Sequence, residues 1–161
     1  MIVHQDNIYS AKKISLNSSY GALVNQYFRY YKLANAEAIT LSCQVSIRWI
    51  ENKMNEKINK ILKTQEVDYV IASDTDSIYL NLGPLVERVY EGREKTNQNV
   101  VGFLNKVCEN EFEPFIEGAY ETLARYLNAY EQKMFMKREN IAERGSGTAK
   151  KRYIRNVWDR E

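Results

Sequence analysis

The chain has 161 residues, of which 44% are hydrophobic and 27% are charged, and its net charge at pH 7 is +2. These values are ordinary for one soluble globular domain that is large enough to bury a core. No apolar run is long enough to span a bilayer, and no signal peptide is recognisable. One histidine and two cysteines cannot supply a zinc site of familiar spacing.

The charges are unevenly distributed along the chain. Residues 1–35 carry four Lys/Arg against one acid, residues 66–122 carry twelve Asp/Glu against four Lys/Arg, and residues 132–161 carry nine Lys/Arg against four acids. A basic start, an acidic middle and a basic end suit a protein that holds a polyanion near an acidic metal-binding centre. The two cysteines, Cys43 and Cys108, lie far apart in apolar patterns, which predicts free thiols in a reducing cytosol.

The first chemically informative segment is KKISLNSSYG, residues 12–21. If the chain is helical from Lys13 to Leu23, Lys13, Asn17 and Tyr20 lie on one face at positions i, i+4 and i+7. An ammonium, an amide and an aromatic ring in one row could hold a nucleoside triphosphate, with the ammonium near the phosphates and the ring near a base pair. Alone, such a row is equally compatible with an ordinary helix surface.

Two long helices are expected, over residues 34–62 and 98–129. In the first, apolar residues repeat every three or four positions, which gives one buried stripe. In the second, Pro114 predicts a kink or two abutting helices. The expected buried residues are Ile39, Cys43, Ile47, Ile50, Met54, Ile58 and Ile61 in the first helix, and Val100, Leu104, Val107, Cys108, Phe112, Phe115, Ala119, Leu123 and Leu127 in the second.

Between these helices, residues 67–73 and 77–82 have the composition of a β-hairpin, which Gly83 and Pro84 terminate. Residues two apart on a strand share a face, so Asp74 and Asp76 are expected to project together at the hairpin tip. Two adjacent carboxylates repel unless a cation lies between them, and Mg²⁺ prefers such oxygen ligands together with substrate phosphates. Asp-Thr-Asp is also a favourable sequence for a turn, and most Asp-x-Asp turns have no metal-binding role.

The C-terminal part predicts strands at residues 132–137 (QKMFMK) and 150–158 (KKRYIRNVW), joined by a flexible turn in ERGSGTAKK, residues 143–151. The basic residues Lys150, Lys151 and Arg152, with Tyr153, suit contact with a nucleic-acid backbone, although a charge-protected edge strand has the same composition. A hairpin and further strands packed on helices indicate an α+β fold. One more strand before residue 34 would make the pattern ferredoxin-like.

Taken together, the three pieces resemble the family B (α-like) DNA polymerases, and within them the T4-like bacteriophage replicative polymerases. Residues 13–21 are similar to the fingers-helix motif K-x-x-x-N-S-x-Y-G, residues 74–77 to the palm motif Y-G-D-T-D-S, and residues 150–153 to the K-K-R-Y motif near the thumb junction. The linking segments FRYYKLANAEAIT and MFMKRENIA are also similar to the phage branch. The resemblance spans nearly the whole chain, with the motifs in the family's order.

The resemblance implies a role for each matched residue. Asp74 and Asp76 match the palm carboxylates that hold two Mg²⁺ ions, with Asp76 the more direct ligand. Lys13 and Asn17 match residues that face the phosphates of the incoming nucleotide, and Tyr20 matches the aromatic beside the nascent base pair. Lys151, with Tyr153, matches residues that hold the primer end, Lys150 and Arg152 are further DNA-binding residues of the same motif, and Glu139 matches an auxiliary acid near the site.

The resemblance implies the following organisation and partners. Residues 1–33 would be the last part of a fingers helix with its link, and residues 34–161 an incomplete ferredoxin-like palm in which an antiparallel sheet packs on two long helices. The partners would be primer-template DNA, dNTP, the remainder of the polymerase (upstream palm strand, fingers, exonuclease and thumb) and a sliding clamp, with no membrane. The place of action would be the cytoplasm of a phage-infected bacterial cell.

This sequence also departs from the family pattern. Ala72 and Ser73 replace the Tyr-Gly that precedes the first aspartate, and Lys137 stands where the phage branch often has an acid. The other palm motif, D-x-x-S-L-Y-P-S, is absent, which implies a segment of a longer polymerase or one half of a split gene, inactive alone. The alternatives are a non-catalytic nucleic-acid-binding module, a structural fragment, or another palm enzyme such as a cyclase or reverse transcriptase, which lacks the helix motif.

Overall fold

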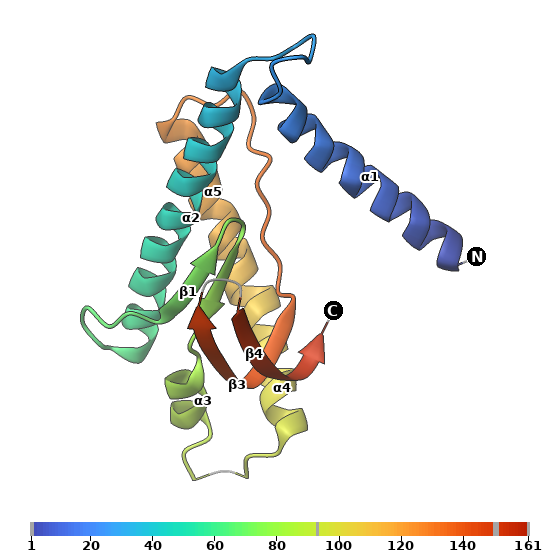
Figure 1. The fold of residues 1–161 in the computed structure, drawn as a ribbon. Coiled ribbons are helices and arrows are strands. Elements are labelled where there is room, and N and C mark those ends of the chain that lie inside the picture. The colour runs from blue at the N-terminus through green and yellow to red at the C-terminus, as the bar shows by residue number, and fades with distance from the viewer. Residues whose placement is uncertain (1, 93, 150–151, 161) are drawn as a thin grey trace. The chain divides into compact units, whose positions relative to one another are not determined.

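The computed structural model describes residues 2–92, 94–149 and 152–160, and only the backbone of residues 2–6, 9, 147–149, 152, 153 and 160. The chain divides into two compact units, Met1–Val45 and Ser46–Glu161, and each is described by itself. The described elements mix helices with antiparallel hairpins, which confirms the α+β class (Figure 1). Within the described residues, no helix is long and apolar enough to cross a lipid bilayer.

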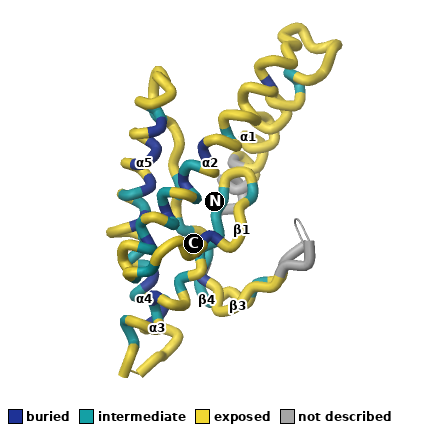
Figure 2. The backbone as a smooth tube through the Cα atoms, turned by 90° about the vertical axis from the view of Figure 1, so that its left-hand side faces the viewer, coloured by how far each residue is buried: buried dark blue, intermediate teal, exposed yellow. Residues whose placement is uncertain are grey.

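The first unit contains helix α1, Ile2–Leu23, a loop, and the first turns of helix α2, Leu33–Leu62. The helix expected from Lys13 to Leu23 is therefore confirmed, and it begins earlier, at Ile2. The side chains from residue 10 to residue 21 are all exposed (Figure 2). Helix α1 thus has no buried stripe along this stretch.

Helix α2 matches the helix expected over residues 34–62. Ile50, Met54 and Ile58 are 0%, 0% and 1% exposed, as the apolar stripe predicted. Towards the ends of the stripe, Ile39 and Ile61 are 44% and 38% exposed, so these two residues were wrongly assigned to the buried side. The periodic pattern identified the buried face correctly, but Ile39 and Ile61 towards its ends are less covered than its middle.

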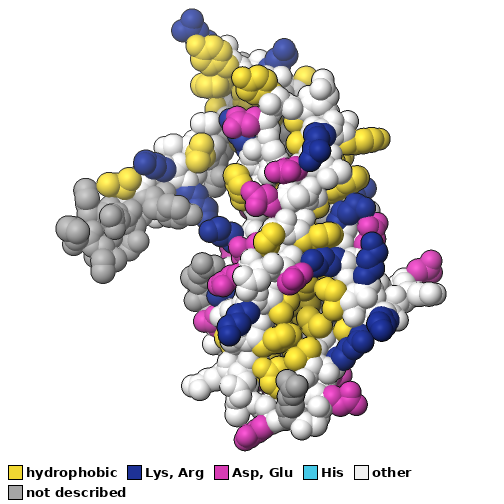
Figure 3. Space-filling view, turned by 180° about the vertical axis from the view of Figure 1, so that it is seen from behind, with side chains coloured by type: hydrophobic (Ala, Val, Ile, Leu, Met, Phe, Trp, Pro, Cys, Tyr) yellow, Lys and Arg dark blue, Asp and Glu magenta, His cyan; other side chains and the backbone are white. Residues whose placement is uncertain are grey.

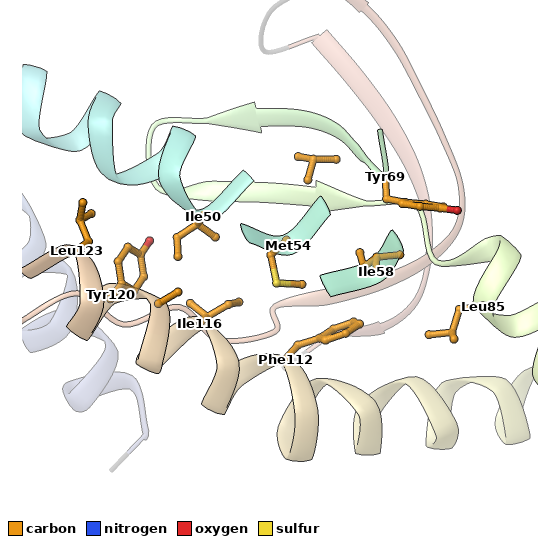
Figure 4. Packing of buried hydrophobic residues seen from close by; sticks show 11 residues of the cluster. Ile50, Met54, Ile58, Tyr69, Leu85, Phe112, Ile116, Tyr120 and Leu123 are labelled. Carbon is orange, nitrogen blue, oxygen red and sulfur yellow. The ribbon is translucent and has the colours of Figure 1, made fainter. Parts of the chain in front are cut away.

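The core of the second unit lies around the middle of α2. Hairpin strands β1, Val70–Asp74, and β2, Ser77–Leu80, lie on one side of α2, and helix α5, Glu113–Tyr126, lies on the other (Figure 4). The buried cluster consists of Ile50, Met54 and Ile58 on α2 together with Tyr69, Val70, Leu85, Phe112, Ile116, Ala119, Tyr120 and Leu123. Full burial of one large apolar side chain is worth about 1.5–3 kcal/mol, so this cluster fixes the hairpin against the helices.

The helix expected over residues 98–129 is divided, as Pro114 predicted. Helix α4, Asn97–Val107, leads into a π-helical turn η1, Cys108–Phe112, and α5 follows with Pro114 in its first turn. The π-helical turn just before Pro114 shifts the backbone bonds, since the Glu113 N–H donates to the Cys108 carbonyl five residues back, and such a shift is a common way to accommodate an interruption of the regular helix. The chain leaves α5 at Asn128, which has a left-handed φ of 52°. Leu127 is consequently 51% exposed, and its assignment to the buried side was wrong.

Helix α3, Gly83–Val89, was not predicted. Gly83 and Pro84 were interpreted only as a strand terminator, but proline is also a common residue in the first turn of a helix. β2 does end before them, at Leu80, and the helix that follows places Leu85 in the core, at 6% exposure.

The predictions for the C-terminal strands are partly wrong. Strands β3, Asn140–Ala149, and β4, Arg152–Arg160, pair antiparallel, so most of the expected flexible turn is strand. Gly145 pairs with Arg155 and Gly147 with Tyr153, because cross-strand pairing outweighs the weak local preference of glycine. Residues 132–137 are not a strand, since they have no strand partner in the described part of the chain.

The described strands form two separate two-stranded sheets, β1–β2 and β3–β4. The ferredoxin-like arrangement expected from the sequence would require a further strand to extend these hairpins into one sheet. The two hairpins nevertheless touch, because the Arg155 guanidinium on β4 lies 5.3 Å from the centre of the Tyr79 ring on β2.

Candidate active site

The two aspartates lie at the tip of the β1–β2 hairpin. Asp74 pairs with Ser77 as the last pair of the ladder, which leaves Thr75 and Asp76 as the turn. The Asp76 N–H donates to the Asp74 carbonyl over 2.6 Å, and Thr75 has a left-handed φ of 50°. A β-branched residue is unfavourable in this region, so the turn holds local backbone strain. Strain of this kind is common where a chain must aim functional side chains.

Side-chain contacts around the tip involve mainly Asp74. The Thr75 hydroxyl donates to the Asp74 carboxylate over 3.1 Å, and the Ser77 hydroxyl donates to the Asp74 carbonyl over 3.2 Å. Asp74 is half-buried, whereas Asp76 is exposed. Asp76 therefore has the more accessible carboxylate of the two.

The register of the hairpin determines which face carries Asp74. Ser73 pairs with Ile78, and Ile78 packs against the core. Since successive residues alternate between faces, Asp74 and its partner Ser77 lie on the opposite face, together with Tyr79. The Arg155 guanidinium lies over Tyr79 on that face, so strand β4 contributes positive charge beside the carboxylate hairpin.

Helix α2 holds the base of the hairpin through two asparagines, Asn55 and Asn59. The Asn55 side-chain oxygen accepts the N–H groups of Tyr69 and Val70, over 2.8 and 3.2 Å. The Asn59 amide donates to the Val67 carbonyl over 2.7 Å and accepts the Val67 N–H over 3.2 Å. Sequence reasoning missed both residues. The available signal was their spacing of one helical turn beside the apolar stripe.

The two aspartates have the donor chemistry of a Mg²⁺ site, but they are an incomplete ligand set. Carboxylate oxygens are suitable ligands, and among the described residues neither aspartate forms an ion pair that would compete with a cation. No cluster of three or more His, Cys, Asp or Glu side chains that could hold a metal occurs in the described part of the chain. The residues therefore fit part of a magnesium site whose remaining ligands would come from water, substrate or another segment.

The row expected on α1 is present in the first unit. Lys13, Asn17 and Tyr20 are helical, share one face by their spacing, and are exposed. The Tyr20 hydroxyl lies 2.8 Å from the Thr40 hydroxyl on α2, which itself donates to the Ala36 carbonyl over 3.0 Å. Tyr20 is therefore the donor to Thr40. Tyr20, Ala36 and Thr40 line an apolar hollow of about 460 Å³ together with Val24, Leu33, Glu37 and Leu41, whereas Lys13 and Asn17 do not line it.

The remaining predicted site residues lie in the second unit. Arg152 and Tyr153 begin strand β4, whereas Lys150 and Lys151 fall outside the described residues. Glu139 is exposed and directly precedes strand β3. Its neighbour Arg138 is anchored by an ion pair of 3.1 Å with Asp159 on β4, and the Arg138 N–H donates to the Glu113 carboxylate. The structure thus places Glu139 beside a fixed residue, just before the β3–β4 hairpin, whereas the two aspartates lie in the β1–β2 hairpin.

No family model matches the chain. The chain is 44% identical over 158 residues to the DNA-directed DNA polymerase of Enterobacteria phage T4, and 40% identical over 158 residues to that of Escherichia phage RB69. Each match covers 93% of this chain but only 18% of the relative. At this identity, the chain is homologous to one stretch of these two phage DNA-directed DNA polymerases.

Proposed function

We propose that the chain is the palm part, with the last fingers helix, of a family B DNA-directed DNA polymerase, and that it acts in template-directed nucleotide addition to a primer 3′-hydroxyl. Residues 1–33 would belong to the fingers and residues 34–161 to the palm. The observation that carries the proposal is the Asp74–Asp76 turn within a chain 44% identical to part of a polymerase. The place of action would be the cytoplasm of an infected bacterium.

In this proposal, the aspartates hold Mg²⁺ at the reacting end of the primer. Asp76 offers the exposed carboxylate, and Asp74 is oriented by the Thr75 hydroxyl. When bound, Mg²⁺ would lower the pKa of the primer hydroxyl and neutralise the charge of the triphosphate. A further carboxylate would be needed, because the D-x-x-S-L-Y-P-S motif does not occur in this sequence.

The remaining residues would bind and orient the two substrates. Lys13 and Asn17 would contact the phosphates of the incoming dNTP, and Tyr20 would lie beside the nascent base pair, held by its hydrogen bond to Thr40. The primer strand would be held by Lys150, Lys151, Arg152 and Tyr153, with Glu139 as an auxiliary acid near the site. Primer-template DNA, the remaining polymerase domains and a sliding clamp are the proposed partners.

The test uses a hybrid in which this chain replaces the homologous stretch of the T4 polymerase. The hybrid should extend a primer, and Asp76→Asn should lower the rate at least about a hundredfold, a typical loss when a charge-stabilising group is removed. Glu87→Gln, at an exposed position in α3, serves as the control and should leave the rate unchanged.

The isolated chain provides the second comparison. It should bind Mg²⁺ weakly and should not extend a primer, because two carboxylates supply only part of the ligand set. Primer extension by the isolated chain would contradict the incomplete site. Normal extension by the Asp76→Asn hybrid would contradict the assignment of the carboxylates, and an inactive hybrid with intact fold would contradict the polymerase proposal itself.

A further inference from the structure

The ladder of the β1–β2 hairpin contains one extra residue, Ile71. Val70 pairs with Leu80 and Ala72 pairs with Tyr79, so Ile71 is left without a pair of its own on β2 and forms a β-bulge. The Ile71 side chain is 67% exposed, whereas Val70 directly before it is 7% exposed and belongs to the core. The bulge therefore lies between the buried start of β1 and the aspartate at its end.

This bulge determines the face on which Asp74 lies. Residues four positions apart on a regular strand share a face, so without a bulge the Asp74 side chain would lie on the core side with Val70. Ile71 shifts the alternation by one residue, and the carboxylate lies on the opposite face with its partner Ser77. On the core side it would meet apolar neighbours such as Ile78, which is costly for an unpaired charge. The bulge thus turns the carboxylate away from the core.

Asn55 on α2 binds the chain immediately before the bulge. Its side-chain oxygen accepts the N–H groups of Tyr69 and Val70, over 2.8 and 3.2 Å, and its amide donates to the Asp68 carboxylate over 2.8 Å. The Asp68 carboxylate also accepts the Val70 N–H, over 3.0 Å. On the other strand, the Asn81 N–H donates to the Tyr69 carbonyl over 2.8 Å. These bonds fix the start of β1, so the extra residue must be taken up directly after Val70.

We infer that Asn55 is a positioning residue for the proposed reaction, because it fixes the bulge at Ile71 and thereby directs the Asp74 carboxylate. Asn55 acts through the backbone of β1 and does not itself contact a substrate. Bulges are over-represented next to active sites, where they redirect a side chain. The inference rests on the proposed function for its effect on the reaction rate, but the register of the hairpin can be measured without any polymerase activity.

The first test measures that register in the isolated chain, by nuclear Overhauser effects between backbone protons. In the wild type, Ser73 should contact Ile78 across the strands. In Asn55→Ala, contacts of Ala72 with Ile78 should appear, because the register slips by one residue once the start of β1 is released. A folded Asn55→Ala protein with only the wild-type contact would overturn the inference.

An exchange of two side chains tests the same step without removing either of them. Asn55→Asp keeps the acceptor but places a second carboxylate beside Asp68, so it should also disturb the register. Its added charge should act locally, because Lys/Arg and Asp/Glu side chains are interspersed on the face seen in Figure 3 and salt screens them. The double variant Asn55→Asp/Asp68→Asn restores the hydrogen bond with its direction reversed and should restore the wild-type register. A double variant no better than Asn55→Asp would overturn the inference.

The second test measures primer extension in the polymerase hybrid. Asn55→Ala should lower kcat at least about tenfold, since a displacement of about 1 Å can cost a hundredfold, and should leave KM for dNTP within about twofold. KM should hold because the proposed dNTP residues lie in the first unit, whereas Asn55 lies in the second. The double variant Asn55→Asp/Asp68→Asn should recover most of kcat.

The matched control is Asn105→Ala. Asn105 is half-buried like Asn55 and donates to the Asp159 carboxylate over 3.3 Å, but it lies on α4, outside the hairpin. Its replacement should leave kcat unchanged. Equal losses of kcat in Asn55→Ala and Asn105→Ala, or a raised KM with unchanged kcat in Asn55→Ala, would overturn the inference. An inactive wild-type hybrid would contradict the proposed function alone, and the register measured in the isolated chain would still decide whether Asn55 fixes the bulge.

Discussion

Thr75 combines a left-handed backbone with a β-branched side chain between the two aspartates. Replacement by asparagine, which tolerates this backbone region much better, should raise the free energy of unfolding by about 1 kcal/mol. Urea unfolding of both proteins measures the change. Thr122→Asn is the control, since Thr122 lies within α5, where the two residues have similar helix propensity, and its effect should be close to zero.

An unchanged or lower stability of Thr75→Asn would mean that the turn is not strained. If the prediction holds, the wild-type threonine is kept at a cost in stability, which favours a role for its hydroxyl at the Asp74 carboxylate. That role can be examined separately in the polymerase hybrid, where Thr75→Ser keeps the hydroxyl and Thr75→Val removes it.

Cys108 provides a pH-dependent prediction. Burial raises the pKa of the Cys108 thiol from 9.0 to about 11, opposed by the Arg138 guanidinium and reinforced by the carboxylates of Glu113 and Glu109. Since the folded state holds the proton more tightly than the unfolded state, this stabilisation is complete below pH 9.0 and is lost as pH rises towards 11. The stability difference between the wild type and Cys108→Ala should therefore shrink over that pH range.

Thiol alkylation followed by mass spectrometry gives a direct measurement of the same effect. Cys108 should react slowly in the folded protein until the pH approaches 11, and readily once the protein is unfolded in urea. Both cysteines are free, so Cys43 reports the reagent's activity in the same sample. Fast alkylation of Cys108 in the folded protein near pH 8 would contradict the raised pKa.

At the scale of elements, helices and the first hairpin were predictable because their side-chain periods are local. The stripe of α2 and the alternation around Asp74 are each complete within one segment, so sequence alone identified them. The errors occurred where a distant partner decides the outcome. Residues 143–149 became strand through pairing with β4, which outweighed a glycine-rich composition, and residues 132–137 have a strand-like composition but no strand partner among the described residues.

The residues of the candidate site also differ in how far the sequence could predict them. Asp74, Asp76, Lys13, Asn17 and Tyr20 are predicted site residues, proposed from short motifs and from a family resemblance. The residues that hold them were not, because Asn55, Asn59 and Thr40 act through contacts with segments far from them in sequence. A supporting residue has no signature of its own until the fold brings its partner near, so structure was needed to find these three.

At the scale of the whole molecule, the buried cluster and helix α1 should differ in local stability. Ile50, Met54 and Ile58 on α2 are almost completely buried, whereas the α1 side chains from residue 10 to residue 21 are all exposed. An isolated helix without a buried face is marginal in water, because tertiary packing supplies most helical stability. We therefore expect amide hydrogens of residues 10–21 to exchange at least about tenfold faster than those of residues 50–58.

Hydrogen exchange followed by mass spectrometry measures this difference, and the amides of residues 116–123 in α5, which packs on the same core, serve as the protected control. Equal protection of α1 and the middle of α2 would show that α1 is stabilised by contacts other than its own backbone bonds. If α1 does exchange fast, the same measurement in the polymerase hybrid becomes informative. Protection gained there by residues 10–21 would mean that the helix carrying Lys13, Asn17 and Tyr20 becomes ordered only when the rest of a polymerase packs against it.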